Sequence, residues 1–132
     1  MRIAISTGGG DAPGLNAVIR AAALSAINRG WEVIGIKRGF AGLLGDDEVI
    51  PLTKESVRGI AHLGGTILRT TNRGNPFHYP ILNADGTYTE IDRSNELMQS
   101  ARDWGVDAVI TIGGDGSLEI AQKLCEKGMK IV

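Results

Sequence analysis

Two glycine-acid turns carry the strongest chemical signal in the sequence. The first is GGGD at residues 8–11, and the second is GGDGS at residues 113–117. Each follows an apolar run and precedes a helical pattern. Glycine lets a backbone come close to a ligand, and the free N–H groups at a helix N-terminus attract anions. The pair therefore predicts a binding site for phosphate groups.

The acid in each turn adds a second expectation. A carboxylate beside a phosphate is unfavourable unless a cation lies between them. Asp115 therefore predicts a Mg²⁺ ion that bridges the carboxylate, water and phosphate oxygens. Asp11 either acts likewise or caps the helix that follows it.

Two common nucleotide fingerprints are missing from the first turn. Residues 8–14 do not give the G-x-G-x-x-G pattern of dinucleotide sites. Gly9 and Gly14 have the Walker spacing, but Leu15 and Asn16 stand in place of the lysine and Ser/Thr. The turns thus point to phosphate binding outside these two motif classes.

Positive charge for the phosphates is expected from a long loop. Residues 64–88 contain no convincing helical pattern, and a stretch this long is often a binding loop. Arg69 and Arg73 lie among small polar residues in this loop. An arginine there can contact a phosphate bidentately, and Arg73 is the preferred candidate.

Helices and strands alternate along the chain and must position these residues. Apolar runs predict strands, and apolar residues at helical spacing predict helices. The predicted strands are 2–6, 31–36, 106–112 and one beginning at 129, and the predicted helices are 15–29, 53–63, 89–105 and 117–127. This order predicts a three-layer α/β/α fold with a mostly parallel, Rossmann-like sheet. Both glycine turns would then lie at the carboxyl edge of the sheet, where α/β proteins bind ligands.

Composition limits the class of protein. The chain has 132 residues, about one domain, and a net charge of −1 from 14 basic and 15 acidic residues. This balance disfavours binding to nucleic acid or to a membrane by bulk charge. No apolar run reaches the roughly 20 residues of a membrane span, and the single cysteine forms no intrachain disulfide, so we expect a cytoplasmic protein. Because the last strand stops where a ligand-binding loop should follow, we interpret the chain as a fragment.

Four motifs together resemble the phosphofructokinase family. They are GGGDAPGLNAVIR (8–20), GFAGLLGDD (39–47), GGTIL (64–68) and TIGGDGS (111–117), in the family's order over essentially the whole chain. GGDG alone is unspecific, because lipid and NAD kinases also carry it. The resemblance implies phosphoryl transfer from MgATP to the 1-hydroxyl of fructose 6-phosphate, in glycolysis. The chain, residues 1–132, would be the nucleotide-binding part at the N-terminus of the phosphofructokinase fold.

The resemblance also assigns candidate site residues. Gly10 is expected to approach the nucleotide phosphates, and Phe40 stands where the family often has a tyrosine beside the nucleotide. Asp115 matches the Mg²⁺-associated aspartate. The remaining nucleotide-binding candidates are Arg73 with its neighbour Gly74, Gly114, and the pair Gly116 and Ser117.

Several departures leave alternatives open. The family's catalytic block should begin beyond Val132, so this chain holds no predicted catalytic residue and should be inactive alone. Gly116 favours ATP, whereas Ile120 replaces a frequent glycine and keeps a pyrophosphate-dependent enzyme open. Arg20 matches an effector-binding arginine of bacterial relatives, which implies an allosteric enzyme, although Leu24 replaces its usual companion.

The full-length protein is expected to form a homo-oligomer, a dimer or a tetramer, as its family does. Two readings outside the family also stay open. One is a non-catalytic nucleotide-binding module, and the other is a lipid- or NAD-kinase relative. A lipid- or NAD-kinase relative would have no reason to carry the GGGDAPGLNA block.

Overall fold

A mostly parallel sheet forms the centre of the molecule. The computed structural model describes residues 1–10, 12–45, 48–71 and 74–132. The sheet order is β3-β2-β1-β6, with β1 at Arg2–Thr7, β2 at Glu32–Ile36, β3 at Val49–Pro51 and β6 at Ala108–Ile112. β1 pairs in parallel with β2 and β6, and β3 pairs antiparallel with β2. A parallel bridge between Val109 and Ile131 begins the strand expected at the end of the chain.

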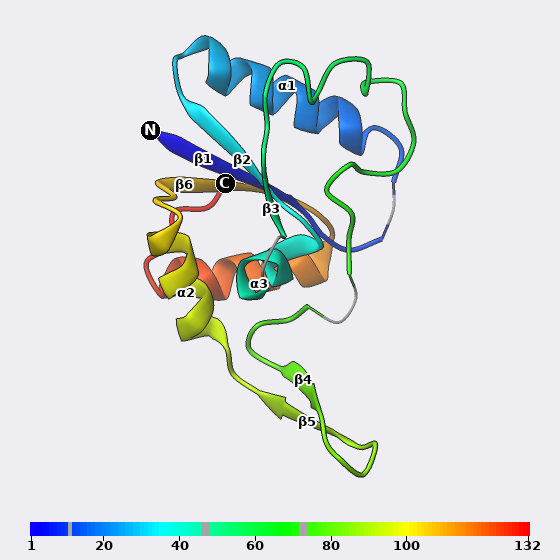
Figure 1. Ribbon diagram of the computed structural model, residues 1–132, viewed down its shortest axis with the longest axis vertical. Helices are drawn as coiled ribbons and strands as arrows, with labels where there is room; N and C mark the ends of the chain where they lie inside the picture. The colour runs from blue at the N-terminus through cyan, green and yellow to red at the C-terminus, as the bar shows by residue number, and fades with distance from the viewer. Residues whose placement is uncertain (11, 46–47, 72–73) are drawn as a thin grey trace.

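Helices cover both faces of this sheet, as the sequence predicts. Helix α1 (Leu15–Asn28) covers one face, and the 3₁₀ helix η1 (Gly39–Leu44), α2 (Ser94–Asp103) and α3 (Asp115–Glu126) lie on the other (Figure 1). The three-layer α/β/α fold is therefore confirmed. No helix within the described residues is both long and apolar enough to cross a membrane.

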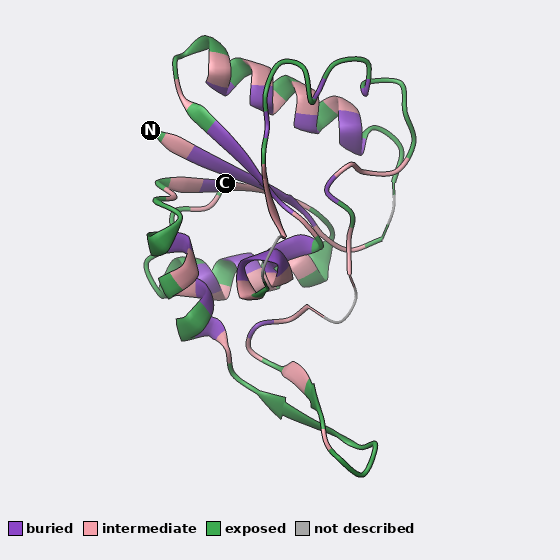
Figure 2. Cartoon of the chain, in the orientation of Figure 1, coloured by how far each residue is buried: buried purple, intermediate pink, exposed green. Residues whose placement is uncertain are grey.

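Strands β1 and β2 are buried on both sides, which explains their continuous apolar sequences. Ile5 of β1 belongs to the core on the α1 side, with Ile19. Its neighbour Ala4 points the opposite way and packs in the core that contains Leu97 and Leu124. Figure 2 shows this buried centre between exposed outer surfaces.

The helix predicted over residues 53–63 is wrong, because the segment forms successive turns. Its start looks like a helix cap, since Ser56 N donates to Thr53 Oγ1 at 3.1 Å and Thr53 N donates to Ser56 Oγ at 2.7 Å. Gly59 then takes a φ of +72°, which ends the right-handed path. Burial of Val57 and Ile60 in the α1-side core holds the turns without a helix.

The helix predicted over residues 89–105 begins later, and the preceding loop is partly ordered as a hairpin. Strands β4 (Tyr79–Leu82) and β5 (Tyr88–Ile91) pair antiparallel and project from the three layers (Figure 1). Asp92 Oδ1 accepts a hydrogen bond from Ser94 N at 2.8 Å where α2 starts. Hydrogen bonding from Ser94, through its side chain and then its backbone, holds the pKa of Asp92 below its ordinary value. Strand pairing therefore overrode the helical pattern at residues 89–91.

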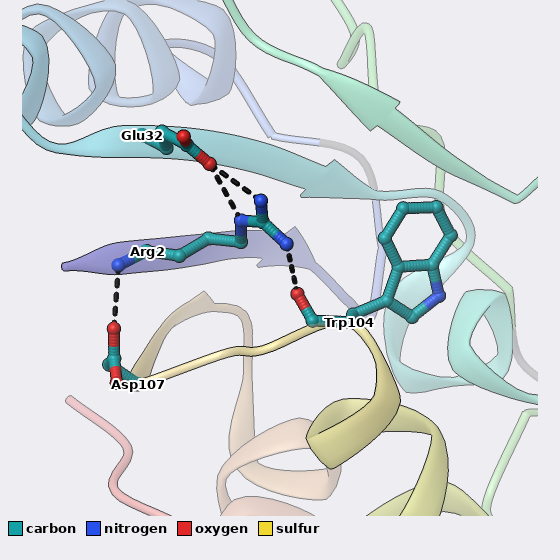
Figure 3. A network of polar contacts seen from close by, with 4 residues as sticks. All are labelled: Arg2, Glu32, Trp104 and Asp107. Atoms are coloured by element: carbon teal, nitrogen blue, oxygen red, sulfur yellow. Dashed lines mark hydrogen bonds and ion pairs between the residues drawn. The ribbon is translucent and has the colours of Figure 1, made fainter.

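Arg2 joins three segments at the amino end of the sheet (Figure 3). Its guanidinium donates to Glu32 Oε2 through Nε at 2.9 Å and Nη2 at 2.6 Å, and its Nη1 donates to the carbonyl of Trp104. Its backbone N donates to Asp107 Oδ2 at 2.7 Å. These contacts tie β1 to β2 and to the α2–β6 connection, at the end of the sheet opposite the glycine turns.

We expect Arg2→Met in the intact protein to lower the free energy of unfolding by about 1–2 kcal/mol, because three side-chain hydrogen bonds are lost while the apolar stem is kept. Urea unfolding measures the change. The matched control is Arg102→Met, which removes only contacts to Gln99 on the same helix and should stay within about 0.5 kcal/mol. Equal effects of the two variants would contradict this role of Arg2.

Candidate nucleotide-binding site

The two glycine turns lie side by side at the carboxyl edge of the sheet. They follow the adjacent parallel strands β1 and β6, and Gly8 N donates to the carbonyl of Ile112 at 2.9 Å. A Cβ atom on Gly9 would lie 3.4 Å from the backbone N of Gly114. The structure thus brings the two turns into contact, as their predicted strand positions require.

The glycines of the two turns differ in whether a Cβ atom at their position would collide with Ser117. A Cβ on Gly8 would collide with Ser117 Oγ, and a Cβ on Gly113 would lie 2.7 Å from Ser117 Cβ and 3.0 Å from the carbonyl of Gly8. Close packing between the turns therefore requires these two glycines. In contrast, a Cβ on Gly10, Gly114 or Gly116 would meet no atom within 4 Å. These three predicted site residues leave room for a ligand beside the backbone.

Helix α3 directs its N-terminus at the same edge. Gly114 caps the helix, and the first intrahelical bond runs from Leu118 N to the carbonyl of Gly114 at 3.0 Å. The N–H groups ahead of Leu118 have no intrahelical acceptor, which leaves them able to bind an anion. Asp115, the first residue of the helix, is exposed. The second acid, Asp11, lies outside the described residues.

A cavity of about 300 Å³ lies against the turns. Four predicted site residues line it: Phe40, Gly74, Gly116 and Ser117. Gly10, Gly114 and Asp115 are absent from its lining, although Gly10 follows the lining residue Gly9 and Asp115 precedes the lining residue Gly116. Arg73 lies outside the described residues. The lining is completed by residues from four segments: Gly8, Gly9, Arg38, Gly39, Thr71, Asn75, Thr111, Glu119, Ile120 and Lys123.

Sequence reasoning missed the two cations of this lining, Arg38 and Lys123. Lys123 Nζ lies 3.4 Å from Glu119 Oε1 and 5.6 Å from the centre of the Phe77 ring. Arg38 Nη2 donates to Glu48 Oε1 at 2.6 Å. The sequence could have revealed Lys123, because residues 116, 119, 120 and 123 follow the i, i+3, i+4, i+7 pattern of one helix face. Arg38 gave no comparable signal.

Phe40 and Ile120 serve both the cavity and the core. Phe40 is only 5% exposed and belongs to the buried cluster beneath η1, so its ring presents little surface to the cavity. Ile120 is partly buried against the same cluster and lines the cavity. Ile120, which stands where the family frequently has a glycine, thus lies at the cavity wall.

The sequence match now decides the family. Residues 2–132 match the family model described as Phosphofructokinase. The chain belongs to the phosphofructokinase family. This match covers nearly all of the chain, so the lipid- and NAD-kinase reading is excluded.

Curated relatives in the phosphofructokinase family share nearly half of the residues. "ATP-dependent 6-phosphofructokinase 2" of Clostridium perfringens is 46% identical over 132 residues, covering 99% of this chain and 36% of that protein. "ATP-dependent 6-phosphofructokinase" of Chloroflexus aggregans is 47% identical over 131 residues, again covering 99% of this chain and 36% of the relative. The chain therefore spans little more than a third of the length of these relatives.

Solved phosphofructokinase structures have the same fold. Pichia pastoris phosphofructokinase in the T-state superposes with a TM-score of 0.80 at 32% identity, covering 99% of this chain and 13% of that chain. A pyrophosphate-dependent phosphofructokinase from Marinobacter aquaeolei superposes with a TM-score of 0.72 at 17% identity, covering 99% of this chain and 32% of that chain. The second likeness concerns the fold alone.

Proposed function

We propose that the intact protein transfers the γ-phosphoryl group of MgATP to the 1-hydroxyl of fructose 6-phosphate, and that residues 1–132 bind the nucleotide. The relatives at 46% and 47% identity are named ATP-dependent 6-phosphofructokinases, which supports the reaction. The observation that carries the nucleotide role is the contact between the two glycine turns beside a cavity. The proposal implies a glycolytic, cytoplasmic enzyme that forms a homo-oligomer.

Backbone groups would do most of the phosphate binding. Gly10 and Gly116 leave open space beside the chain, so phosphate oxygens can approach their N–H groups closely. The N-terminus of α3 adds a favourable dipole for negative charge. Lys123 and Arg38, both lining the cavity, supply positive charge to the same space. Arg73 stays a candidate for a further phosphate contact.

The site also fits a magnesium ion that comes with the nucleotide. Among the described residues, no group of three or more His, Cys, Asp or Glu side chains could hold a metal ion. Mg²⁺ is commonly bound by one or two carboxylates, with phosphates and water completing its coordination. Asp115 is exposed beside the lining residue Gly116 and can provide such a carboxylate. The bound ion would neutralise phosphate charge.

Phosphoryl transfer needs mainly positioning and charge stabilisation, and these are the tasks of this chain in the proposal. The turns hold the phosphates, and Asp115 fixes the ion beside them. In this proposal, the base that accepts the proton of the sugar hydroxyl and the sugar-phosphate site would correspond to parts of the relatives that this chain does not span. The alternative hypothesis outside the enzymes is that the protein is a non-catalytic nucleotide-binding module.

Pyrophosphate is the second candidate donor, because the Ile120 side chain lines the cavity and narrows the room for a nucleotide. A coupled assay of the intact protein with fructose 6-phosphate and either MgATP or magnesium pyrophosphate decides between the donors. We expect kcat/KM to be at least about 100-fold higher with MgATP. Faster turnover with pyrophosphate would reverse the assignment, and no turnover with either donor would favour the non-catalytic module.

A further inference from the structure

A pair of hydrogen-bonded hydroxyl groups, those of Thr7 and Thr66, joins the end of β1 to the loop that leads to the cavity. Thr7, the last residue of β1, is fully buried. Thr7 Oγ1 lies 2.9 Å from Thr66 Oγ1 and donates to the carbonyl of Arg69 at 2.9 Å. Thr66 Oγ1 also accepts a hydrogen bond from Leu68 N at 3.1 Å. Thr7 is thus hydrogen-bonded to both ends of the turn at residues 66–69, through the Thr66 hydroxyl and the Arg69 carbonyl.

The donors in this hydroxyl pair follow from counting hydrogens. A hydroxyl has one hydrogen to donate. Since the Thr7 hydrogen goes to the carbonyl of Arg69, Thr66 must donate its own hydrogen to Thr7. Each hydroxyl therefore donates once and accepts once, and removing either oxygen leaves a partner without its hydrogen bond.

Asn16 fastens the preceding part of the same loop. It is 2% exposed in the first turn of α1. Its Nδ2 donates to the carbonyls of Leu63 at 3.3 Å and Gly64 at 3.2 Å, and its Oδ1 accepts from Ile67 N at 2.8 Å. These three hydrogen bonds of the buried Asn16 side chain thus all join the start of α1 to the backbone of residues 63–67.

Backbone strain is concentrated where this loop meets the cavity wall. Arg38 and Arg69 are the two non-glycine residues with positive φ in the described part of the chain, at +56° and +58°. They are linked through Leu68, whose carbonyl accepts a hydrogen bond from Arg38 N at 2.8 Å. Non-glycine residues persist in this conformation only where their surroundings enforce it. The Thr7 bond to the carbonyl of Arg69 is such a constraint.

Both strained residues precede segments that line the cavity. Arg38 leads into Gly39 and Phe40, and Arg69 leads to Gly74 and Asn75. The two walls also touch, because a Cβ on Gly74 would lie 2.9 Å from Ala41 Cβ in η1. A shift of the 66–69 turn would therefore move both walls together.

We infer that Thr7 and Asn16 are positioning residues for nucleotide binding: they hold residues 63–69 in the strained path that sets both walls of the cavity. Neither residue lines the cavity itself. The inference rests on the proposed function, because it assumes that the cavity binds the phosphates of the donor.

The test uses Thr7→Val in the intact enzyme, with Thr7→Ser as the matched control. Valine has nearly the same shape but cannot take part in the hydroxyl pair, whereas serine keeps the oxygen. We expect Thr7→Val to raise the KM for MgATP about tenfold or more, because small displacements in a binding site are costly. The KM for fructose 6-phosphate should change less than about twofold, and Thr7→Ser should restore the nucleotide KM.

The outcomes separate the inference from the proposed function. If folded Thr7→Val has the same KM for MgATP as the wild type, the inference is overturned. The proposed function still stands in that case if the wild-type enzyme is active. Loss of stability without the selective KM change would likewise overturn it. If Thr7→Val does not fold, Thr66→Val decides, because it breaks the same hydroxyl pair at a less buried residue and must show the same selective rise. A wild-type enzyme without nucleotide binding would overturn the proposed function, and the inference with it.

Discussion

Asp115→Asn in the intact enzyme is expected to lower kcat by at least about 100-fold, because the substitution keeps the size of the side chain but removes the charge that holds the magnesium ion. The KM for Mg²⁺ should rise at the same time. Folding should be little affected, since Asp115 is exposed and its effect on the helix dipole is worth about 0.3–1 kcal/mol. Steady-state kinetics across a magnesium titration measures both effects.

Glu126→Gln is the matched control for Asp115→Asn. It also removes one negative charge from α3, but at the exposed far end of the helix. We expect its kcat to stay within about twofold of wild type. If Asp115→Asn showed an equally small change, Asp115 would not be the carboxylate that holds the metal.

Gly116→Ala is expected to separate ligand binding from stability, with opposite effects on the two. A Cβ at this position meets no protein atom within 4 Å, and alanine is favoured over glycine in a helix by up to about 1 kcal/mol. The variant should therefore unfold at the same or a slightly higher temperature. Its new methyl group fills space at the cavity wall, so we expect MgATP affinity to fall at least about tenfold.

Gln122→Ala controls for adding an alanine to the same helix. Gln122 is exposed and does not line the cavity, so its MgATP affinity should match the wild type. Calorimetric titration with MgATP under conditions that prevent turnover, with fructose 6-phosphate left out, compares the three proteins. Wild-type affinity in Gly116→Ala would mean that the phosphates do not approach this part of the backbone.

The central layers were predictable because their sequences have a single consistent explanation. β1 and β6 are short apolar runs, and α1 has a clear helical stripe, so local preference and burial agree. The start of α3 was predicted two residues late, at 117 instead of Asp115, but its place was correct, because a glycine turn after an apolar strand puts a helix N-terminus at the carboxyl edge of the sheet. These elements position both glycine turns.

The errors arose where strand pairing or burial outweighed the local helical pattern. Residues 89–91 begin the predicted helix 89–105, but they belong to a strand that pairs with residues 79–82 as a hairpin. Thr53 offers a cap, but Gly59 and the burial of Val57 hold the segment in turns. The burial of Val57 in the α1-side core cannot be seen in a local window of sequence.

The glycine turns were the part of the candidate site that residue patterns alone predicted, while the family resemblance added Phe40 and Gly74. Gly8 and Gly113 serve packing against Ser117, whereas Gly10, Gly114 and Gly116 leave open space, a difference that the turn pattern without the family resemblance does not reveal. Arg38 lines the cavity because the β2–η1 connection folds over it, a placement that depends on tertiary contacts. The Thr7–Thr66 hydroxyl pair joins residues 59 positions apart and was likewise invisible.

A crystal structure of the intact protein with magnesium and a non-hydrolysable ATP analogue tests the central claim most directly. The account predicts phosphate oxygens at about 3 Å from the backbone nitrogens of Gly10 and Gly116, with a magnesium ion between the phosphates and the Asp115 carboxylate. An analogue bound away from both glycine turns, or a magnesium ion held without Asp115, would contradict it.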